Sequence, residues 1–225
     1  MCGRYSLGDT KSIQEWFDAS VPDLYLVPQY NISPGQEIPI VVQNRPRTVK
    51  LLTWGFYPEW SIRAGMKKLQ FNARDDTIAK SVHAGKVEYR RCLVPATGFF
   101  EWKREGKEAS PFHFRLKEGV MFAFAGVYLE SGGKDCCAIV TTTPNALSAP
   151  IHNRMPVILH KEEAIQWVDN GKPWEEVMPL MRPYPDDEME VYPVTSNVGN
   201  ARNDTHSLLE PRPEDIEKGS GPNPA

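Results

Sequence analysis

The sequence predicts one strand-rich α+β domain whose sheet forms a partly closed barrel. The length of 225 residues suits a single mid-sized domain, and 40 % of the residues are hydrophobic, which is enough for a core. Short apolar runs are broken by Pro, Gly and Asn, and helical periodicity is limited to a few short segments. No internal repeat or Ser/Gly-rich linker divides the chain. We therefore expect a single domain over residues 1–210, followed by a flexible polar tail at 211–225.

The strands are expected at apolar runs that lie between turn residues. These runs cover residues 41–42, 49–52, 92–94, 112–116, 120–127, 137–140 and 157–159. Helices are expected at about 10–17, 75–84 and 162–170, with another short helix from Pro173. The first begins at a Thr or Asp suited to an N-cap, and the third carries apolar residues at helical spacing.

The net charge of −3 argues against a protein that coats nucleic acid through bulk charge. The distribution is uneven, because the first 115 residues hold 17 Lys and Arg against 12 Asp and Glu. A local anion-binding face in this half is compatible with that excess. No apolar run reaches the roughly 18 residues of a spanning helix, and the N-terminus lacks the apolar region of a secretory signal. We expect a cytoplasmic protein without membrane contact, associated with the nucleoid if it is bacterial.

Four cysteines fit the same compartment. Cys136 and Cys137 are adjacent in an apolar run, and no Cys-x-x-Cys or Cys/His ligand spacing occurs. With Cys92 they are expected to be small buried core residues rather than disulfide partners or metal ligands. No metal and no cofactor are expected.

Cys2 follows Met1 directly and precedes Gly3. A small second residue allows an aminopeptidase to remove Met1, which exposes an α-amine on the carbon next to a thiol-bearing one. An α-amine has a pKa of about 7.7–8.0 and is partly neutral at cellular pH. It can add to an aldehyde to give an imine, and the thiol can then close a five-membered thiazolidine ring. This chemistry makes Cys2 a candidate for covalent aldehyde capture.

Six motifs accompany Cys2 along the chain. They are MCGRY (1–5), TWGFYPEW (53–60), FNAR (71–74), GFFEW (98–102), IHNRMP (151–156) and VTSNVGN (194–200). In this order and spacing the set resembles the SOS-response-associated peptidase family, also called abasic-site processing proteins. The resemblance covers residues 1 to about 200.

The resemblance implies a fold, a substrate and a site. The fold is one compact domain, a twisted mixed β-barrel flanked by short helices. The activity is the shielding of abasic sites in single-stranded DNA by a thiazolidine DNA–protein crosslink through the N-terminal Cys. The family's catalytic positions match Cys2, Asn72, Glu101 and His152 without substitution.

The chemistry of these residues supports such roles independently. Glu101 lies between Phe100 and Trp102, and strand alternation would place it on the same face as Phe99. Partial burial there would raise its pKa into a useful acid–base range. His152 could protonate a departing ring oxygen or bind a phosphate, and Asn72 could orient the Cys2 amine or sugar hydroxyls. The alternatives are a solvent-facing Glu, a structural His and a turn-forming Asn.

Further residues are candidates for DNA contact through phosphate or base. Arginines suit bidentate phosphate binding, exposed aromatic rings can stack on bases, and small polar side chains can donate to phosphate oxygens. The candidates are Arg4, Arg74 and Arg154, Trp54 and Trp60, and Thr142, Thr143 and Asn145. No more than one or two tryptophans are expected to touch DNA, since most tryptophans are core residues.

Two other functions stay open at this point. One is a cysteine peptidase with Cys2 as thiol nucleophile and His152 as base. The other is a non-catalytic module that binds single-stranded DNA. The expected partner in the main hypothesis is single-stranded DNA containing abasic sites, the expected state is a monomer, and contacts with replication proteins are an open question.

Overall fold

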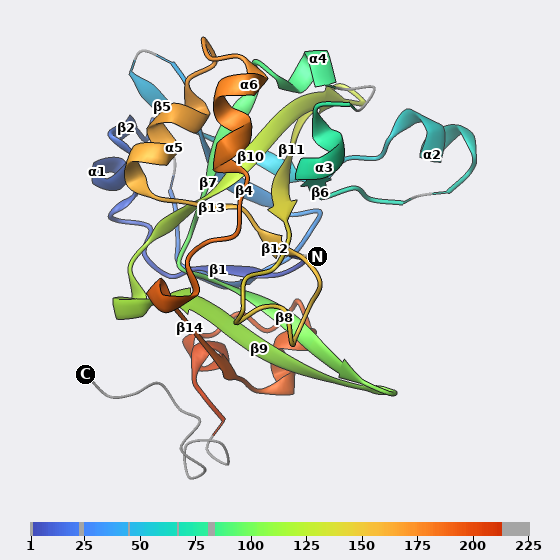
Figure 1. Ribbon diagram of the computed structural model, residues 1–225, viewed down its shortest axis with the longest axis vertical. Helices are drawn as coiled ribbons and strands as arrows, with labels where there is room; N and C mark the ends of the chain where they lie inside the picture. Colours follow the sequence, from blue (N-terminus) through green and yellow to red (C-terminus); the bar gives the residue numbers. More distant parts are fainter. Residues whose placement is uncertain (1, 23–24, 45, 67, 81–83, 213–225) are drawn as a thin grey trace.

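Five strands close into a barrel at the centre of the molecule (Figure 1). Around the barrel these are β11 (Lys134–Thr142), β10 (Phe122–Ser131), β7 (Arg91–Ala96), β4 (Glu37–Val42) and β5 (Arg47–Trp54). Neighbours pair antiparallel except β5 and β11, which run parallel where Cys137 lies opposite Trp54. The computed structural model describes residues 2–22, 25–44, 46–66, 68–80 and 84–212. The predicted α+β class with a mixed barrel is confirmed.

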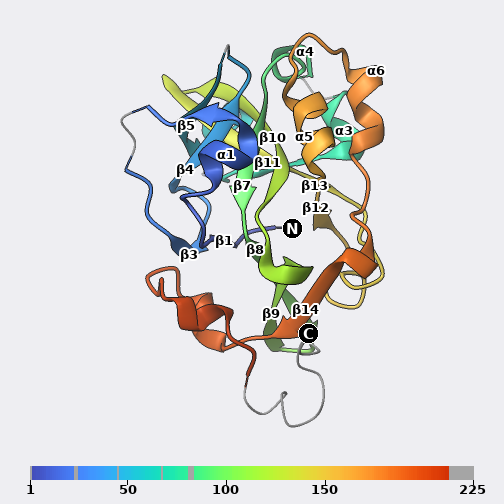
Figure 2. The same ribbon diagram turned by 90° about the vertical axis from the view of Figure 1, so that its left-hand side faces the viewer.

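A second sheet lies beside the barrel (Figure 2). Its order is β14 (Met189–Pro193), β9 (Glu108–Leu116), β8 (Gly98–Glu105), β1 (Tyr5–Leu7) and β3 (Gln29–Ile32). Its strand β1 also packs on the barrel, because the Tyr5 ring meets Trp54 edge-to-face at 5.3 Å between centroids. The N-terminal segment therefore runs between the two sheets.

Four short strands extend the barrel sheet: β2 (Ala19–Ser20), β6 (Asn72–Arg74), β12 (Met155–Pro156) and β13 (Ile158–Leu159). Strand β6 pairs parallel with β11, so that Asn72 lies opposite Ile139. Strand β12 pairs with the end of β11, where Met155 lies opposite Thr142. One barrel strand thereby brings together two motif segments that are about eighty residues apart in the sequence.

The helices are short. They are α1 (Ile13–Phe17), α2 (Glu59–Arg63), α3 (Asp75–Ile78), α4 (Ala84–Val87), α5 (Lys161–Val168) and α6 (Trp174–Val177), with 3₁₀ turns η1 (Lys117–Gly119), η2 (Met178–Leu180), η3 (Asp186–Glu188), η4 (Ser196–Gly199) and η5 (His206–Leu209). Helix α5 packs on β7 and β10. No helix among the described residues is long and apolar enough to span a membrane.

Several predicted boundaries are wrong. The helix expected over 75–84 ends at Ile78. Ile78 is the single residue that α3 buries, so the helix has no longer apolar face whose packing would stabilise further turns. The first helix begins at Ile13 rather than Thr10, since the Asp9 carboxylate accepts from the Lys11 and Ser12 amides and holds the chain in a turn. The strand expected from residue 120 begins at Phe122, after η1.

The predicted roles of the other cysteines are confirmed, since Cys92, Cys136 and Cys137 are buried and unbridged. Of the predicted tail, the structure describes Pro211 and Arg212, where Pro211 bridges to Val194 and the Arg212 amide donates to Pro193 O at 3.1 Å. Residues 213–225 lie outside the described chain.

Candidate functional site

Cys2 is fully buried between the two sheets, just before β1. The Asn72 side chain on β6 donates from Nδ2 to the Cys2 carbonyl at 2.9 Å. Because β6 is fixed by its pairing with β11, this hydrogen bond ties residue 2 to the barrel wall. The structure thus brings together two of the predicted site residues.

Glu101 approaches Cys2 from the second sheet. Strand β8 pairs with β1 so that Phe99 lies opposite Tyr5, and the Phe100 amide donates to Arg4 O at 2.9 Å. The same register carried one step further sets Glu101 beside the residue that follows Cys2. Glu101 is 4 % exposed, as its apolar neighbours predict, and burial raises its pKa to about 7. Burial, and then the Glu101 charge, raise the pKa of the Cys2 thiol well above its usual range.

The glycine that opens the GFFEW motif is required by a buried histidine. A Cβ on Gly98 would lie 2.2 Å from His113 Nε2, so any larger residue would push β8 away from β9. His113 also packs against the Phe100 ring at 4.8 Å between centroids, and its Nδ1 lies 3.0 Å from Tyr192 Oη. Burial lowers the pKa of His113 to about 3, so it is neutral. This packing fixes the backbone that carries Glu101.

His152 lies in a half-buried turn ahead of β12. Its amide donates to Ser148 O at 2.8 Å, and the Arg154 amide donates to its Nδ1 at 3.1 Å. Burial first, and also the charge of Arg104 on β8, lower the pKa of His152, which favours the neutral ring at pH 7.

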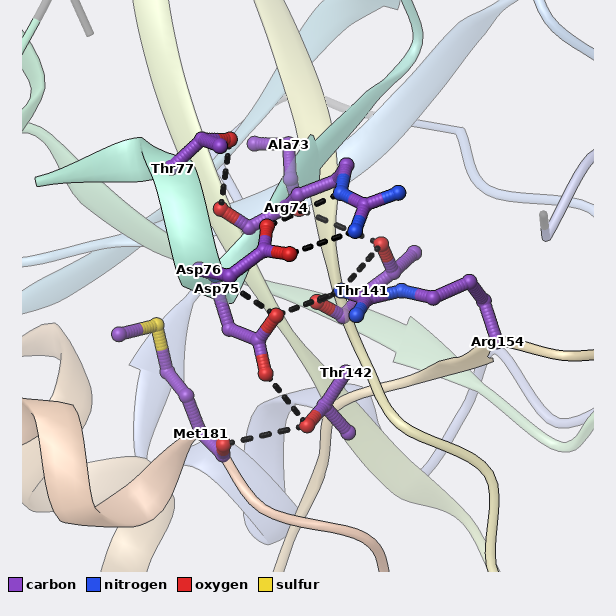
Figure 3. A network of polar contacts seen from close by, with 9 residues as sticks. All are labelled: Ala73, Arg74, Asp75, Asp76, Thr77, Thr141, Thr142, Arg154 and Met181. Carbon is purple, nitrogen blue, oxygen red and sulfur yellow. Dashed lines mark hydrogen bonds and ion pairs between the residues drawn. The ribbon is translucent and has the colours of Figure 1, made fainter. Parts of the chain in front are cut away.

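A buried ion pair joins the His152 turn to the Asn72 strand (Figure 3). Arg154 Nη2 lies 2.6 Å from Asp75 Oδ1 and also donates to Thr141 O at the end of β11. The other Asp75 oxygen accepts from Thr142 Oγ1 at 2.6 Å. Since Asp75 follows β6 directly and Arg154 lies two residues after His152, the pair fixes the separation of the two motif segments.

The candidate DNA-binding residues divide into buried and exposed ones. Arg154 is 7 % exposed and Thr142 is 2 % exposed, and both are engaged in the Asp75 network. Asn145 donates to Tyr184 O and accepts from the Ser148 amide, so its amide holds a loop. Thr143 is exposed. The phosphate contacts expected for these four residues stay predictions.

The two tryptophan candidates have different outcomes. Trp54 is fully buried and donates from Nε1 to Phe71 O at 2.9 Å. Its side chain points into the barrel from the last residue of β5, so stacking on a DNA base is incompatible with its position. Trp60 belongs to α2, but its side chain lies outside the described part of the structure.

The two remaining arginine candidates, Arg4 and Arg74, differ in how strongly other residues of the protein hold their side chains. Arg4 donates from Nη1 to Asn31 Oδ1 at 2.8 Å and to Val198 O at 2.7 Å, so it joins β1 to the 3₁₀ turn of the VTSNVGN motif. Arg74 is half exposed and pairs with the equally exposed Asp76 at 2.5 Å. A phosphate could compete for Arg74 more easily than for Arg4.

Sequence reasoning missed Asn31, which is 2 % exposed and donates to three carbonyls of the segment after β14. No local signal marks it, because its partners lie about 170 residues away. No group of three or more His, Cys, Asp or Glu among the described residues could hold a metal ion.

Comparison with known proteins agrees with this geometry. The family model described as SOS response associated peptidase (SRAP) matches residues 1–201. The chain belongs to this family. The matched range contains Cys2, Asn72, Glu101 and His152, and the structure holds Asn72 on β6 and Glu101 on β8.

Similar proteins in the SRAP family carry a common description. The chain is 35 % identical to the abasic site processing protein YoqW of Bacillus subtilis (strain 168), over 93 % of this chain and 99 % of that protein. It is 31 % identical to the abasic site processing protein HMCES of Mus musculus, over 89 % of this chain and 69 % of that protein. A crystal structure from Bacteroides thetaiotaomicron is similar with a TM-score of 0.80 and 26 % identity, over 94 % of this chain and all of that chain.

Proposed function

We propose that this protein processes abasic sites in single-stranded DNA by capturing them as a thiazolidine on Cys2. The observation that carries the proposal is the position of Cys2. Its carbonyl accepts a hydrogen bond from Asn72, and the charge of the buried Glu101 carboxyl raises the pKa of its thiol. The similarity to proteins named for abasic site processing supports the substrate. The amine and thiol of an N-terminal cysteine supply the chemistry for capturing the aldehyde of an abasic site.

The reaction begins once Met1 has been removed by hydrolysis. An abasic deoxyribose is mostly a closed hemiacetal, and ring opening moves a proton from the C1 hydroxyl to the ring oxygen. A carboxyl with a pKa of about 7 can accept that proton and return it at neutral pH, which is the role of Glu101. His152, held by the Arg154 amide at Nδ1, offers its other ring nitrogen to the departing oxygen.

The open aldehyde then reacts in two additions. The neutral α-amine of Cys2 adds to C1, and an amine proton passes to the oxygen to give a carbinolamine. The carbinolamine loses its hydroxyl as water with a proton from Glu101, and the nitrogen returns its proton to the Glu101 carboxylate, leaving an imine. The thiol adds to the imine carbon, and its proton passes to the nitrogen. The product is a thiazolidine plus one water, and Asn72 keeps residue 2 in place throughout.

The raised pKa of the Cys2 thiol bears on the peptidase alternative. A cysteine peptidase attacks with a thiolate, and such cysteines have a lowered pKa in an electropositive setting. Here burial and the Glu101 charge keep the thiol protonated. This favours the amine as first nucleophile, with the thiol closing the ring.

A single assay separates the three functions. The protein, shown by intact mass to lack Met1, is incubated with single-stranded DNA carrying one abasic site, and with the same undamaged strand as control. We expect an adduct that survives denaturation without a reductant, with a mass one water below the sum of both molecules. Reversible binding of the DNA without an adduct would indicate a non-catalytic binding module. Cys2-dependent cleavage of peptides without an adduct would establish the peptidase.

Glu101→Gln tests the acid–base role. The amide keeps the size of the side chain but cannot exchange a proton, so the rate of adduct formation at pH 7 is expected to fall by about 100-fold or more. Affinity for DNA with an unreactive abasic analogue should change by less than about twofold, since the substitution leaves DNA contacts in place. An equal loss of affinity and rate would instead indicate a structural role.

The same substitution should slow adduct formation but raise the free energy of unfolding above about pH 7. Because the pKa of Glu101 is about 7 in the folded state and about 4.3 when unfolded, the native protein holds the extra proton between these values. Stability from this group is therefore lost as pH rises from about 4 to 7. Glu101→Gln should remove this slope and be roughly 1–3 kcal/mol more stable than the wild type at pH 8 in urea unfolding, with little difference at pH 4.

A further inference from the structure

A cavity of about 250 Å³ lies between the α2 segment and α3, directly beside Asn72. Leu69 and Phe71 contribute apolar walls and Gln70 contributes an amide. Asn72 lines the cavity with the same side chain that binds the Cys2 carbonyl. The cavity is therefore separated from the reacting residue by one side chain.

The wall of this cavity is held rigidly. Gln70 and Phe56 exchange two backbone hydrogen bonds, of 2.8 and 3.0 Å. The Phe71 carbonyl accepts from Trp54 Nε1 and from the Ile139 amide, at 2.9 and 3.1 Å. A ligand that enters finds the wall already ordered, which lowers the entropy cost of binding.

The polar groups at the cavity suit a ligand that is both hydrogen-bonding and anionic. Gln70 is exposed, so its side-chain amide can donate to and accept from a ligand, while Asn72 is 8 % exposed and held by its bond to Cys2 O. Lys68 and Arg74 lie at the exposed rim, Arg74 paired with Asp76, and no carboxylate lines the cavity among the residues that the structure describes. This charge matches a phosphate-linked ligand.

We propose that the cavity receives the nucleobase next to the abasic residue. The inference rests on the proposed function and names the part of the DNA that flanks the captured sugar. A flat ring with polar edges suits apolar walls and an amide, and its phosphate meets the cationic rim. The volume of about 250 Å³ is large enough for one base.

The first test measures capture rates on strands in which one neighbour of the abasic site is replaced by a base-free tetrahydrofuran residue. Removing the base on one side should slow capture by about 5- to 150-fold at subsaturating protein, the equivalent of roughly 1–3 kcal/mol of stacking. Removing it on the other side should change little. If neither replacement alters the rate while the adduct still forms, the cavity does not bind a flanking base and the proposed function stands.

A variant whose new side chain fills the cavity provides the second test, with a matched control outside the cavity. Thr77 is exposed on α3 and lines the cavity, so Thr77→Phe should place a ring in the base's position. Lys80→Phe, on the exposed turn after α3, adds the same ring outside the cavity. The Thr77 variant should capture the ordinary substrate as slowly as the wild type captures the base-free one, and be indifferent to removal of that base. The Lys80 variant should behave as the wild type.

A binding measurement keeps the inference testable without any crosslinking. A strand with 2-aminopurine beside an unreactive tetrahydrofuran residue reports on the environment of that base by fluorescence. The wild type and the Lys80 variant should change the emission on binding, while Thr77→Phe should bind without that change. An unchanged emission with the wild type would overturn the base-binding inference, whether or not Cys2 forms an adduct.

Discussion

Cys2→Ala is expected to convert the durable DNA adduct into a transient imine. Alanine is also small enough for Met1 to be removed, so the variant keeps an α-amine in the same place but has no thiol to close the ring. The adduct that survives denaturation should be lost entirely. Borohydride, which reduces imines, should trap the variant on abasic DNA and leave undamaged DNA untouched.

A blocked amine is the matched control for this prediction. A chain with extra residues ahead of Cys2 keeps the thiol but moves the free amine away, and it should form neither the stable adduct nor the trapped one. Together the two proteins separate the roles of the amine and the thiol. A stable adduct on Cys2→Ala without reductant would show that another nucleophile, such as a lysine, captures the aldehyde.

Arg91→Met is expected to destabilise the fold by about 3–5 kcal/mol. Arg91 is fully buried, and its guanidinium donates to the carbonyls of Trp167 and Lys172 at 2.6 and 2.8 Å, and also to those of Glu88 and Asp169. Methionine fills similar volume but leaves these buried carbonyls without donors.

The Arg91 site also explains how the helices are attached. The guanidinium lies 5.9 and 5.8 Å from the ring centres of Trp167 and Trp174, so one side chain joins β7 to α5 and α6. Urea unfolding should show a lower midpoint with an unchanged slope. Arg90→Met is the control, because Arg90 is exposed beside Tyr128, and it should change stability by less than about 1 kcal/mol. Equal losses in both variants would contradict the central role of Arg91.

The motifs predicted the site because they preserve chemistry that needs particular residues. The reactivity proposed for Cys2 is a prediction from its neighbours Met1 and Gly3. The burial of Glu101 follows from its apolar neighbours and strand alternation, and the structure confirms that burial. The strand-rich class follows from short apolar runs, with each main barrel strand containing one of the predicted runs. These features depend on short-range sequence, so the sequence reveals them.

Apart from the element boundaries, the error at Trp54 arises from partners that are distant in the sequence. Trp54 was expected at DNA, but the closure of the barrel between β5 and β11 turns its ring inward. The VTSNVGN motif has a structural use, since Val198 O accepts from both Arg4 and Asn31. Neither relation leaves a periodic signal, because the partners lie more than eighty residues apart.

The sequence by itself determined that the chain folds mainly as strands, and it predicted a candidate site of Cys2 with a carboxyl and a histidine. Only the tertiary structure decided how these groups are held. The Asn72 hydrogen bond to residue 2, the raised pKa of Glu101 and the Asp75–Arg154 ion pair all arise between segments that meet through sheet pairing. Distances across such pairings depend on the packing of the whole chain, which no local pattern encodes.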